Sequence, residues 1–278
     1  MRYFENKVAA ITGAGSGIGQ QLAILLAKKG CHLALSDINV QGLQATRDLI
    51  TDKVIISLTV VDVAQKHQVE AWAEQVMQTH QQVNFIFNNA GVALGSTVEG
   101  ASYEELEWIM DINFWGVVYG TKSFLPFIKQ SGAGHVVNIS SVFGLTAQPT
   151  QSGYNASKFA VRGFTEALRQ ELDRQACGVS ALCVHPGGIK TNIANAARMN
   201  QSLASLGINV DDSKRSFNDF LRYPAEKAAE QILEAVIKNK RRVLIGNDAK
   251  FLDLLQRLLP SAYQVILQGL SQLRDKLK

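Results

Sequence analysis

Short runs of apolar and β-branched residues alternate with longer amphipathic stretches along the whole 278-residue chain. Seven runs have the length and composition of buried strands, at residues 8–12, 32–37, 54–62, 85–91, 135–141, 179–187 and 242–246. Six stretches between them have helical periodicity, at about residues 17–29, 40–50, 66–80, 102–129, 154–175 and 224–239. Strands that alternate with helices form a parallel sheet covered on both faces. The sequence therefore predicts an α/β fold with one doubly wound parallel sheet of about seven strands, in a single domain spanning residues 1–249.

The composition excludes several classes of protein. With 46% hydrophobic and 19% charged residues, the chain can bury a full core. A formal net charge of +4 is too small to predict a nucleic-acid partner. Cys31, Cys177 and Cys183 form no CxxC pair, so we expect reduced thiols, no metal site and a cytoplasmic location. The first residues lack the pattern of a secretory signal, and no stretch reaches the ~18 apolar residues of a membrane-spanning helix.

One long segment and the end of the chain fall outside this alternation. Residues 190–223 read as neither strand nor clear helix, and a loop of this length is usually functional, so we expect a substrate lid. Residues 250–278 carry a helical apolar stripe broken at Pro260, which predicts an amphipathic helical extension. Three interpretations of the extension compete: packing on its own domain or a neighbouring subunit, which is the simplest, covering the substrate entrance, or peripheral contact with a membrane surface.

The first predicted strand runs directly into TGAGSGIG at residues 12–19 and then into a helical stretch. The glycines of this turn lack the Cβ atoms that would obstruct a sharp bend and the close approach of a diphosphate. The free N–H groups at the start of the following helix favour such an anion. This strand–turn–helix context indicates a Rossmann-type dinucleotide site rather than an ordinary tight turn.

The second predicted strand ends at Asp37, about 20 residues after the glycine turn. A carboxylate at this place accepts hydrogen bonds from the hydroxyls of the adenosine ribose, and it repels a 2′-phosphate. No Arg or Lys occurs in the glycine turn or directly after Asp37. The sequence therefore predicts NAD in preference to NADP.

Tyr154 and Lys158 lie four residues apart in QSGYNASK, at the start of a predicted helix. Side chains at this spacing share one helical face within about 6 Å of each other. A phenol that acts as acid and base near neutral pH needs its pKa lowered by about 3 from a usual value near 10, which corresponds to ~4 kcal/mol. A neighbouring ammonium group can supply much of that stabilisation. The pair alone is a common coincidence, so the rest of the chain must support it.

Further short sequences follow in a fixed order: NNAG at 88–91, an Asn at 113, NISS at 138–141 and PGGIKT at 186–191. Together with the glycine turn and the Tyr-x-x-x-Lys pair, they resemble the classical short-chain dehydrogenase/reductase family over roughly residues 5 to 246. The glycine spacing is similar to that family's TGxxxGxG. The resemblance implies an NAD(P)-dependent short-chain alcohol dehydrogenase or ketoreductase that forms a homodimer or homotetramer through helices 102–129 and 154–175.

The resemblance also implies a catalytic set of Asn113, Ser141, Tyr154 and Lys158. Ser141 would orient the substrate oxygen, with Ser140 as the competing assignment. Asn113 would hold a water that links Lys158 to solvent, or it would bond neighbouring backbone within its helix. The implied cofactor contacts are Tyr154 and Lys158 together with Gly13, Ser16, Gly17, Ile18, Gly19, Asp37, Asp62, Val63, Asn89, Ala90, Gly91, Pro186, Gly187, Ile189 and Thr191.

Several of these residues have particular implied roles. Asp62 contacts the adenine amine, and Asn89 lines the adenosine ribose side or ties neighbouring strands together. Ile189 offers backbone atoms, and Thr191 its hydroxyl, to the nicotinamide carboxamide. His185 stands where many relatives have Asn, and we interpret it as structural because Tyr154 and Lys158 already account for proton transfer.

The expected substrate contacts are Ser141, Val142, Phe143, Gln148, Gln151, Tyr154 and Gly187, with apolar members of the lid. Because the segments around the serine and tyrosine contain no Arg or Lys, a neutral, lipophilic secondary alcohol or ketone is expected. A 3-oxoacyl-thioester reductase of the same fold is an alternative, but it usually pairs with NADP and a basic residue near the glycine turn. A non-catalytic NAD-binding scaffold is the other alternative, and it has no use for a complete catalytic set.

Overall fold

The computed structural model of the chain describes residues 3–276 and contains the predicted parallel sheet. Its seven strands lie in the order β11-β7-β6-β4-β1-β2-β3, and every neighbouring pair is parallel. The strands are β1 Val8–Thr12, β2 His32–Asp37, β3 Ile56–Val60, β4 Phe85–Asn88, β6 Gly134–Ile139, β7 Val179–Pro186 and β11 Arg242–Ile245. The prediction of an α/β, doubly wound fold is therefore confirmed.

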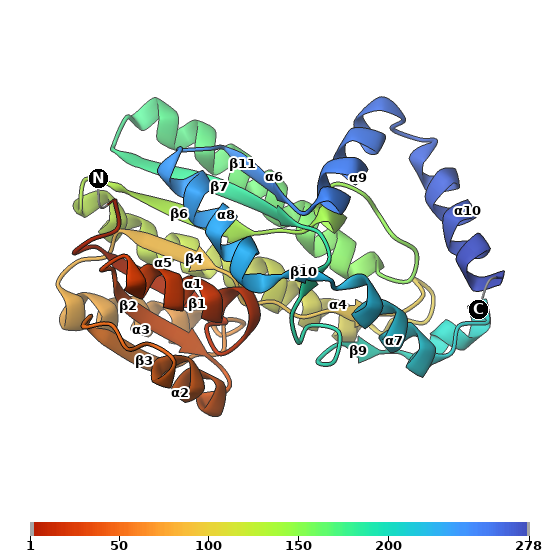
Figure 1. Cartoon of the computed structure of the whole chain (residues 1–278), viewed down its shortest axis with the longest axis horizontal. Helices are drawn as coiled ribbons and strands as arrows, with labels where there is room; N and C mark the ends of the chain where they lie inside the picture. Colours follow the sequence, from red (N-terminus) through yellow and green to blue (C-terminus); the bar gives the residue numbers. More distant parts are fainter. Residues whose placement is uncertain (1–2, 277–278) are drawn as a thin grey trace.

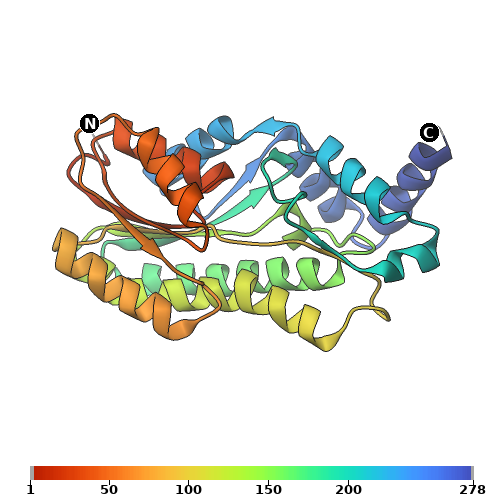
Figure 2. The same ribbon diagram turned by 90° about the horizontal axis from the view of Figure 1, so that it is seen from below.

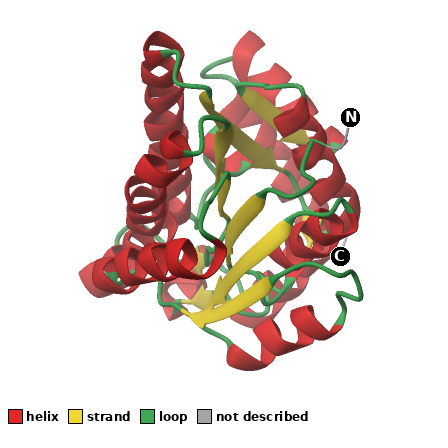
Figure 3. Ribbon diagram, turned by 90° about the vertical axis from the view of Figure 1, so that its left-hand side faces the viewer, coloured by secondary structure: helices red, strands yellow, loops and turns green. Residues whose placement is uncertain are grey.

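Helices cover both faces of the sheet (Figure 2). One face carries α1 Gly17–Lys28, α2 Val40–Asp48 and α8 Ala225–Ile237. The other carries α3 Lys66–His80, α5 Gly116–Gln130 and α6 Ser152–Gln175. Figure 3 shows the strands twisting between these two helical layers.

Alternate residues of each strand supply two separate cores. In β1, Ala9 and Ile11 pack under α1 and α8, whereas Val8 and Ala10 pack under α3 and α5. Each fully buried Ile, Leu or Phe side chain stabilises the fold by about 1.5–3 kcal/mol. Burial on both faces explains why the strands read as continuous apolar runs rather than as alternating patterns.

The helix expected at 102–129 is divided. It consists of α4 Tyr103–Met110, a π-helical turn η1 at Asp111–Trp115, and α5. A capping box closes the start of α4, where Ser102 Oγ accepts from the backbone N–H of Glu105 and the Glu105 carboxylate accepts from that of Ser102. Single π-turns inside helices frequently lie at functional sites, and this one contains Asn113.

The expected lid at 190–223 is not a structureless loop, and that part of the prediction was wrong. It contains the 3₁₀ turn η3 Gln201–Leu206 and the helix α7 Val210–Phe220. Two short parallel pairs hold it to the domain: β5 Leu94–Gly95 with β9 Arg198–Met199, and β8 Ile189–Lys190 with β10 Tyr223–Pro224. α7 has three apolar residues, Val210, Phe217 and Phe220, among eight polar ones, so its apolar content is too low to mark it clearly as a helix in the sequence.

The C-terminal extension forms two helices, α9 Asn247–Leu258 and α10 Tyr263–Lys276, which break around Pro260 as expected. The expected boundary after residue 249 falls inside α9, so the extension begins directly after β11. Figure 1 shows both helices at the end of the molecule that also carries α7. Residues 277–278 of the predicted extension lie outside the described residues. Among residues 3–276, no helix has the length and apolar character needed to cross a membrane.

Candidate active site

A cavity of about 400 Å³ opens at the carboxyl ends of β1 and β4, where the order of the strands reverses. Open α/β sheets bind their ligands at this switch point. The cavity is lined by most of the predicted residues: Gly13, Ser16, Gly17, Ile18, Asp37, Asp62, Val63, Asn89, Ala90, Gly91, Ser141, Val142, Phe143, Tyr154, Lys158, Pro186, Gly187, Ile189 and Thr191. Segments from every part of residues 13–191 therefore meet at one place.

The glycine turn requires its glycines for backbone conformation and for space. Gly13 and Gly17 have positive φ angles of 64° and 56°. A Cβ atom on Gly13 would lie 2.8 Å from the Cα of Ala90, and one on Gly19 would lie 2.2 Å from the carbonyl oxygen of Gly13. Gly19 does not line the cavity, so its contribution is to let α1 pack tightly behind the turn.

The start of α1 fits a diphosphate. Ser16, the N-cap residue, makes no side-chain capping hydrogen bond, and the first turn contains no acidic residue. The N–H groups and positive end of the helix therefore remain available beside a cavity that Ser16, Gly17 and Ile18 line. This arrangement is suited to an anion from a nucleotide cofactor.

Asp37 lies at the end of β2, against the glycine turn. Its carboxylate accepts hydrogen bonds from the backbone N–H groups of Gly15, at 2.8 Å, and Asn39, at 2.9 Å. These bonds fix the carboxylate at the rim of the cavity, near Asp62 and Val63. Among the described residues that line the cavity, Lys158 is the single Lys or Arg, so a 2′-phosphate would meet Asp37 without a cation to neutralise it.

Asn89 both lines the cavity and ties β1 to β4. Its side-chain amide donates to the carbonyl oxygens of Thr12 and Gly13, at 3.0 and 3.1 Å. In return, Thr12 Oγ1 accepts from the backbone N–H groups of Asn89 and Ala90. The turn after β4 is thereby bonded directly to the glycine turn, and contact of Asn89 with an adenosine ribose stays a prediction.

Tyr154 and Ser141 face each other inside the cavity. Tyr154 is 7% exposed and lines the cavity together with Ser141. Burial raises the pKa of Tyr154, and hydrogen bonding with the Ser141 side chain opposes that rise. Ser140 Oγ instead donates to the carbonyl oxygen of Lys158, at 2.8 Å. The geometry therefore favours Ser141 over Ser140 as the serine that would contact a substrate oxygen.

Lys158 lies one helical turn after Tyr154, with its ammonium nitrogen 5.7 Å from the centre of the phenol ring. Nζ donates to the carbonyl oxygen of Ile139, at 3.0 Å. A Cβ atom on Gly91 would lie 3.4 Å from Nζ and 3.2 Å from Asn113 Oδ1, so the glycine allows these two polar groups to approach each other. The predicted pair on one face of the helix is present.

Asn113 is fully buried in the π-turn η1. Its Oδ1 accepts from the N–H of Val92, at 2.8 Å, while its Nδ2 donates to the carbonyl oxygen of Val92 and to Ser157 Oγ. The side chain thus bonds a distant strand end and α6, not its own helix. Asn113 does not line the cavity directly but lies behind Gly91.

We expect replacement of Lys158 by Met to stabilise the protein. Burial lowers the pKa of Lys158 to about 8, from 10.5. Between pH 8 and 10.5, Lys158 is therefore protonated to a greater extent in the unfolded chain than in the folded one. Burying the cation lowers the free energy of unfolding by its full amount below pH 8, and this loss decreases as the pH rises toward 10.5. Allowing for the lost bond to Ile139, Lys158→Met should raise the free energy of unfolding at pH 7 by about 2 kcal/mol.

Urea unfolding at pH 7, 8.5 and 10 measures this effect, with the exposed Lys227→Met on α8 as the control. The advantage of Lys158→Met should shrink as the pH rises, while the control stays close to wild type at each pH. A destabilised Lys158→Met at pH 7, or an advantage that does not change with pH, contradicts the expectation.

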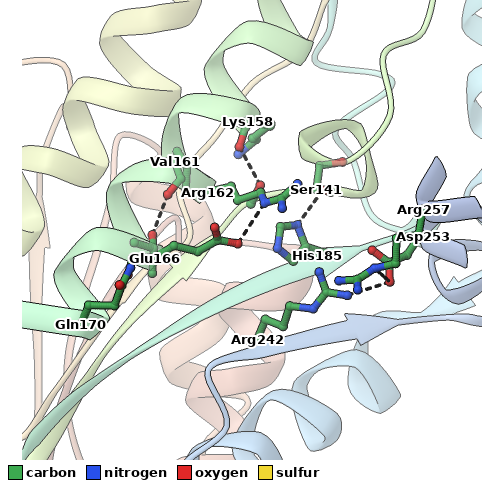
Figure 4. Close-up of polar contacts among 12 residues, drawn as sticks. Ser141, Lys158, Val161, Arg162, Glu166, Gln170, His185, Arg242, Asp253 and Arg257 are labelled. Atoms are coloured by element: carbon green, nitrogen blue, oxygen red, sulfur yellow. Dashed lines mark hydrogen bonds and ion pairs between the residues drawn. The ribbon is translucent and has the colours of Figure 1, made fainter. Parts of the chain in front are cut away.

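His185 bonds to the backbone of Ser141 (Figure 4). Its Nδ1 lies 3.0 Å from the carbonyl oxygen of Ser141, so Nδ1 must carry the proton that is donated. Nε2 has no hydrogen-bond partner among the described residues. Burial lowers the pKa of His185 to about 4, so the ring is neutral at physiological pH. His185 does not line the cavity.

The substrate side of the cavity is apolar, and the cavity as a whole has further lining residues that sequence reasoning did not assign. Phe143 packs edge-on against Tyr154 and stacks on Phe220 of α7, with ring centres 6.2 and 6.4 Å apart. The unassigned lining residues are Ile38, Asn39, Val61, Val92, Ile112, Ile139 and Asn192. Ile38 and Asn39 directly follow the predicted Asp37, so their position could have indicated them.

Two predicted substrate contacts, Gln148 and Gln151, do not line this cavity, and their contact with a substrate stays a prediction. The segment that contains them is bonded to β5 and its neighbours: the N–H of Ser96 donates to the carbonyl oxygen of Thr150, at 2.8 Å, and Ser96 pairs with Gln151. The side-chain amide of Asn155 also donates to the carbonyl oxygen of Gln148. These bonds hold the segment outside the cavity wall.

Comparison with known proteins agrees with this geometry. Residues 7–202 match the short chain dehydrogenase family. The chain is 44% identical over 270 residues to SadH of Mycobacterium tuberculosis, which is named as an oxidoreductase, with 95% of each chain covered.

Solved structures give the same result. A short chain dehydrogenase/reductase from Burkholderia phymatum, crystallised with NAD, is 30% identical and superposes with a TM-score of 0.81 over 88% of this chain and 90% of its own. Levodione reductase is 29% identical, with a TM-score of 0.77 over 90% of this chain and 98% of its own. The family match, the parallel sheet and the cavity at its switch point together show that the chain is an oxidoreductase of the short-chain dehydrogenase/reductase family.

Proposed function

We propose that this protein is an NAD-dependent oxidoreductase that interconverts a neutral, lipophilic secondary alcohol and its ketone. One observation carries the proposal: the Tyr154 hydroxyl, the Ser141 side chain and the Lys158 ammonium converge on a cavity whose other walls are a glycine turn and Asp37. The hydroxyl, serine and ammonium groups suit proton transfer at an alcohol oxygen. The glycine turn and Asp37 suit the binding of a dinucleotide.

The residues then have distinct roles. Ser141 and Tyr154 hold the alcohol oxygen between their hydroxyl groups, and Tyr154 accepts its proton. The nicotinamide of bound NAD would supply the hydride acceptor and a positive charge beside the phenol. Because burial raises the pKa of Tyr154, Lys158 must favour the phenolate by its charge. Asn113, which approaches Lys158 across Gly91, would hold a water that exchanges protons with solvent.

The chemistry of the walls supports an apolar substrate. Beyond Tyr154 and Ser141, the cavity is bounded by Phe143, Ile193, Phe217 and Phe220. A carboxylate or phosphate on the substrate would meet these side chains without an arginine to pair with it. A relative of this chain is named levodione reductase, which adds a cyclic ketone to the classes worth testing.

The preference for NAD can be measured by titrating the protein with NADH and NADPH by calorimetry. Because the Asp37 carboxylate is fixed by two backbone N–H groups, it cannot turn away from a 2′-phosphate. We expect NADH to bind at least about 30-fold more tightly, and Asp37→Asn to reduce that ratio about tenfold by removing the like-charge repulsion. Equal affinities in the wild-type protein contradict the NAD assignment.

The reaction is tested by following NADH absorbance with a panel of probes. Cyclohexanol, 2-octanol and 1-phenylethanol are offered with NAD, and levodione with NADH. Lactate serves as a charged comparison of the same reaction type, and turnover of lactate above that of all the neutral probes would contradict the substrate class. Binding of NADH without turnover of any probe would favour the non-catalytic scaffold.

Members of this family commonly assemble as oligomers, and we expect a dimer or tetramer formed through α5 and α6. Trp115, at the start of α5, and Phe159, on α6, are large apolar side chains that remain 44% and 40% exposed. Burying them against a second copy would be favourable.

A further inference from the structure

The carboxylate of Asp248, in the first turn of α9, contacts the turn that follows β7. Its Oδ2 accepts from the backbone N–H of Gly188, at 2.6 Å. A Cβ atom on Gly187 would lie 2.2 Å from the same oxygen, and one on Gly246 would lie 2.3 Å from Oδ1, so the flanking glycines make room for this contact. The C-terminal extension therefore holds the Gly187–Gly188 turn by a charge-assisted hydrogen bond.

That turn is also part of the cavity wall and of the base of the lid. Pro186, Gly187 and Ile189 line the cavity. The carbonyl oxygen of Gly188 accepts from the N–H groups of Arg222 and Tyr223, at 2.9 and 2.8 Å, at the end of the segment that carries α7. A shift of the turn would therefore move both the cofactor side of the cavity and the lid.

The extension also contacts the loop that begins at Ser141. Val142, directly after the serine, packs in one cluster with Ala249 and Leu252 of α9, and Leu267 of α10 packs against that cluster. At the far end of the same loop, the N–H of Ala147 donates to the hydroxyl of Tyr263, at 3.2 Å. Tyr263 is 6% exposed, although most of the described α10 side chains around it are exposed. Both ends of the serine loop thus rest on the extension.

An ion-pair cluster fixes α9 to the edge of the sheet (Figure 4). Asp253 of α9 accepts from Arg242 of β11, at 2.6 Å, and from Arg257, at 3.0 Å. The carboxylate is 10% exposed, so water screens these bonds only weakly. With β11 paired to β7, α9 is connected to the strand that ends at Pro186. The helix that carries Asp248 is therefore fixed to the sheet, and Tyr263 follows it directly in the chain.

We propose that α9 and α10 position two active-site loops: Asp248 holds the Gly187–Gly188 turn for the cofactor, and Tyr263 holds the Ser141–Ala147 loop for catalysis. Asp248 and Tyr263 act as positioning residues, since neither lines the cavity. The proposal builds on the function proposed above, but the two can fail separately.

Hydrogen exchange gives a test that needs no cofactor. Asp248→Ala should speed exchange in peptides containing Gly188, and Tyr263→Phe should speed it in peptides containing Ala147, because each variant removes the acceptor of that amide proton. Each variant should leave the other peptide unchanged. Lys250→Ala, an exposed position on α9, is the control and should leave both peptides as in wild type. Unchanged exchange in both variants overturns the proposal, whether or not the wild-type protein binds NADH.

The Kd for NADH and the kcat of the variants then distinguish a role in positioning the two loops from a general role in stability. Asp248→Ala should raise the Kd for NADH about tenfold, whereas Asp248→Asn, which keeps an oxygen acceptor, should recover to within about threefold of wild type. Tyr263→Phe should lower kcat for 1-phenylethanol about fivefold with the Kd for NADH unchanged. A purely structural role predicts lower thermal stability with no such split, and that result would overturn the proposal. Absence of NADH binding by the wild-type protein would instead refute the proposed function.

Discussion

Replacing Tyr154 by Phe is expected to lower kcat by about 10³-fold, because it removes the hydroxyl that exchanges a proton with the substrate oxygen. The ring itself should remain in place. Tyr154 is buried, and Phe143 packs against its ring edge-on rather than through the hydroxyl. The Kd for NADH should therefore stay within about threefold of wild type.

The matched control for this substitution is Tyr103→Phe, which removes a hydroxyl from an 83% exposed side chain on α4. It should leave both kcat and the Kd for NADH as in wild type. Turnover is followed with the probe that reacts fastest, and binding with NADH alone. A Tyr154→Phe protein that retains a tenth or more of wild-type kcat would remove Tyr154 from the mechanism.

Replacing Gly19 by Ala is expected to abolish measurable NADH binding and to cost about 3 kcal/mol of stability. Within a helix, Gly→Ala is ordinarily favourable by up to about 1 kcal/mol. Here the added Cβ atom would lie 2.2 Å from the carbonyl oxygen of Gly13 and 2.6 Å from the side-chain nitrogen of Asn89. The first of these atoms is backbone and cannot rotate away, so overpacking outweighs the gain in helix propensity.

The clash also lies in the glycine turn, which is the part of the site that we expect to contact the diphosphate of the cofactor. Moving the Gly13 carbonyl displaces the turn and breaks the bond that Asn89 makes to it, at 3.1 Å. Gly269→Ala in α10 is the matched helical control, since no atom lies within 4 Å of the added Cβ. Calorimetric titration with NADH and urea unfolding compare the two. If Gly19→Ala binds NADH as wild type does, the close packing of α1 behind the glycine turn is not needed for the cofactor.

The features of the structure that could be predicted are those marked by residues close together in the sequence. The strand runs are apolar because both faces of the sheet are covered, and the glycine turn lies between a strand and a helix that the same few residues define. Tyr154 and Lys158 share a face because they are one turn apart in α6. In each case the residues that form the pattern are neighbours in the sequence, so the local pattern was sufficient.

The parts that could not be predicted depend on distant segments. Asp248 bonds Gly188 across 60 residues, and Tyr263 bonds Ala147 across 116. Neither contact has a local signature, because each is set by where α9 leaves the edge of the sheet. The helix α7 was missed for a different reason. Its segment is mostly polar, and its local signals are weak: the N-cap Asn209, whose side chain accepts from the N–H groups of Asp211 and Asp212, and the sparse apolar positions Val210, Phe217 and Phe220.

The π-turn at Asp111–Trp115 affects how related sequences must be compared with this one. Such a turn holds one residue more than a regular helical turn, so α4 and α5 are out of phase by about 100°. A relative that lacks one residue of this turn would still align an asparagine with Asn113. The side chain of that asparagine would, however, point away from the residue that corresponds to Val92. The length of this helix is therefore as informative about a relative's chemistry as the asparagine itself.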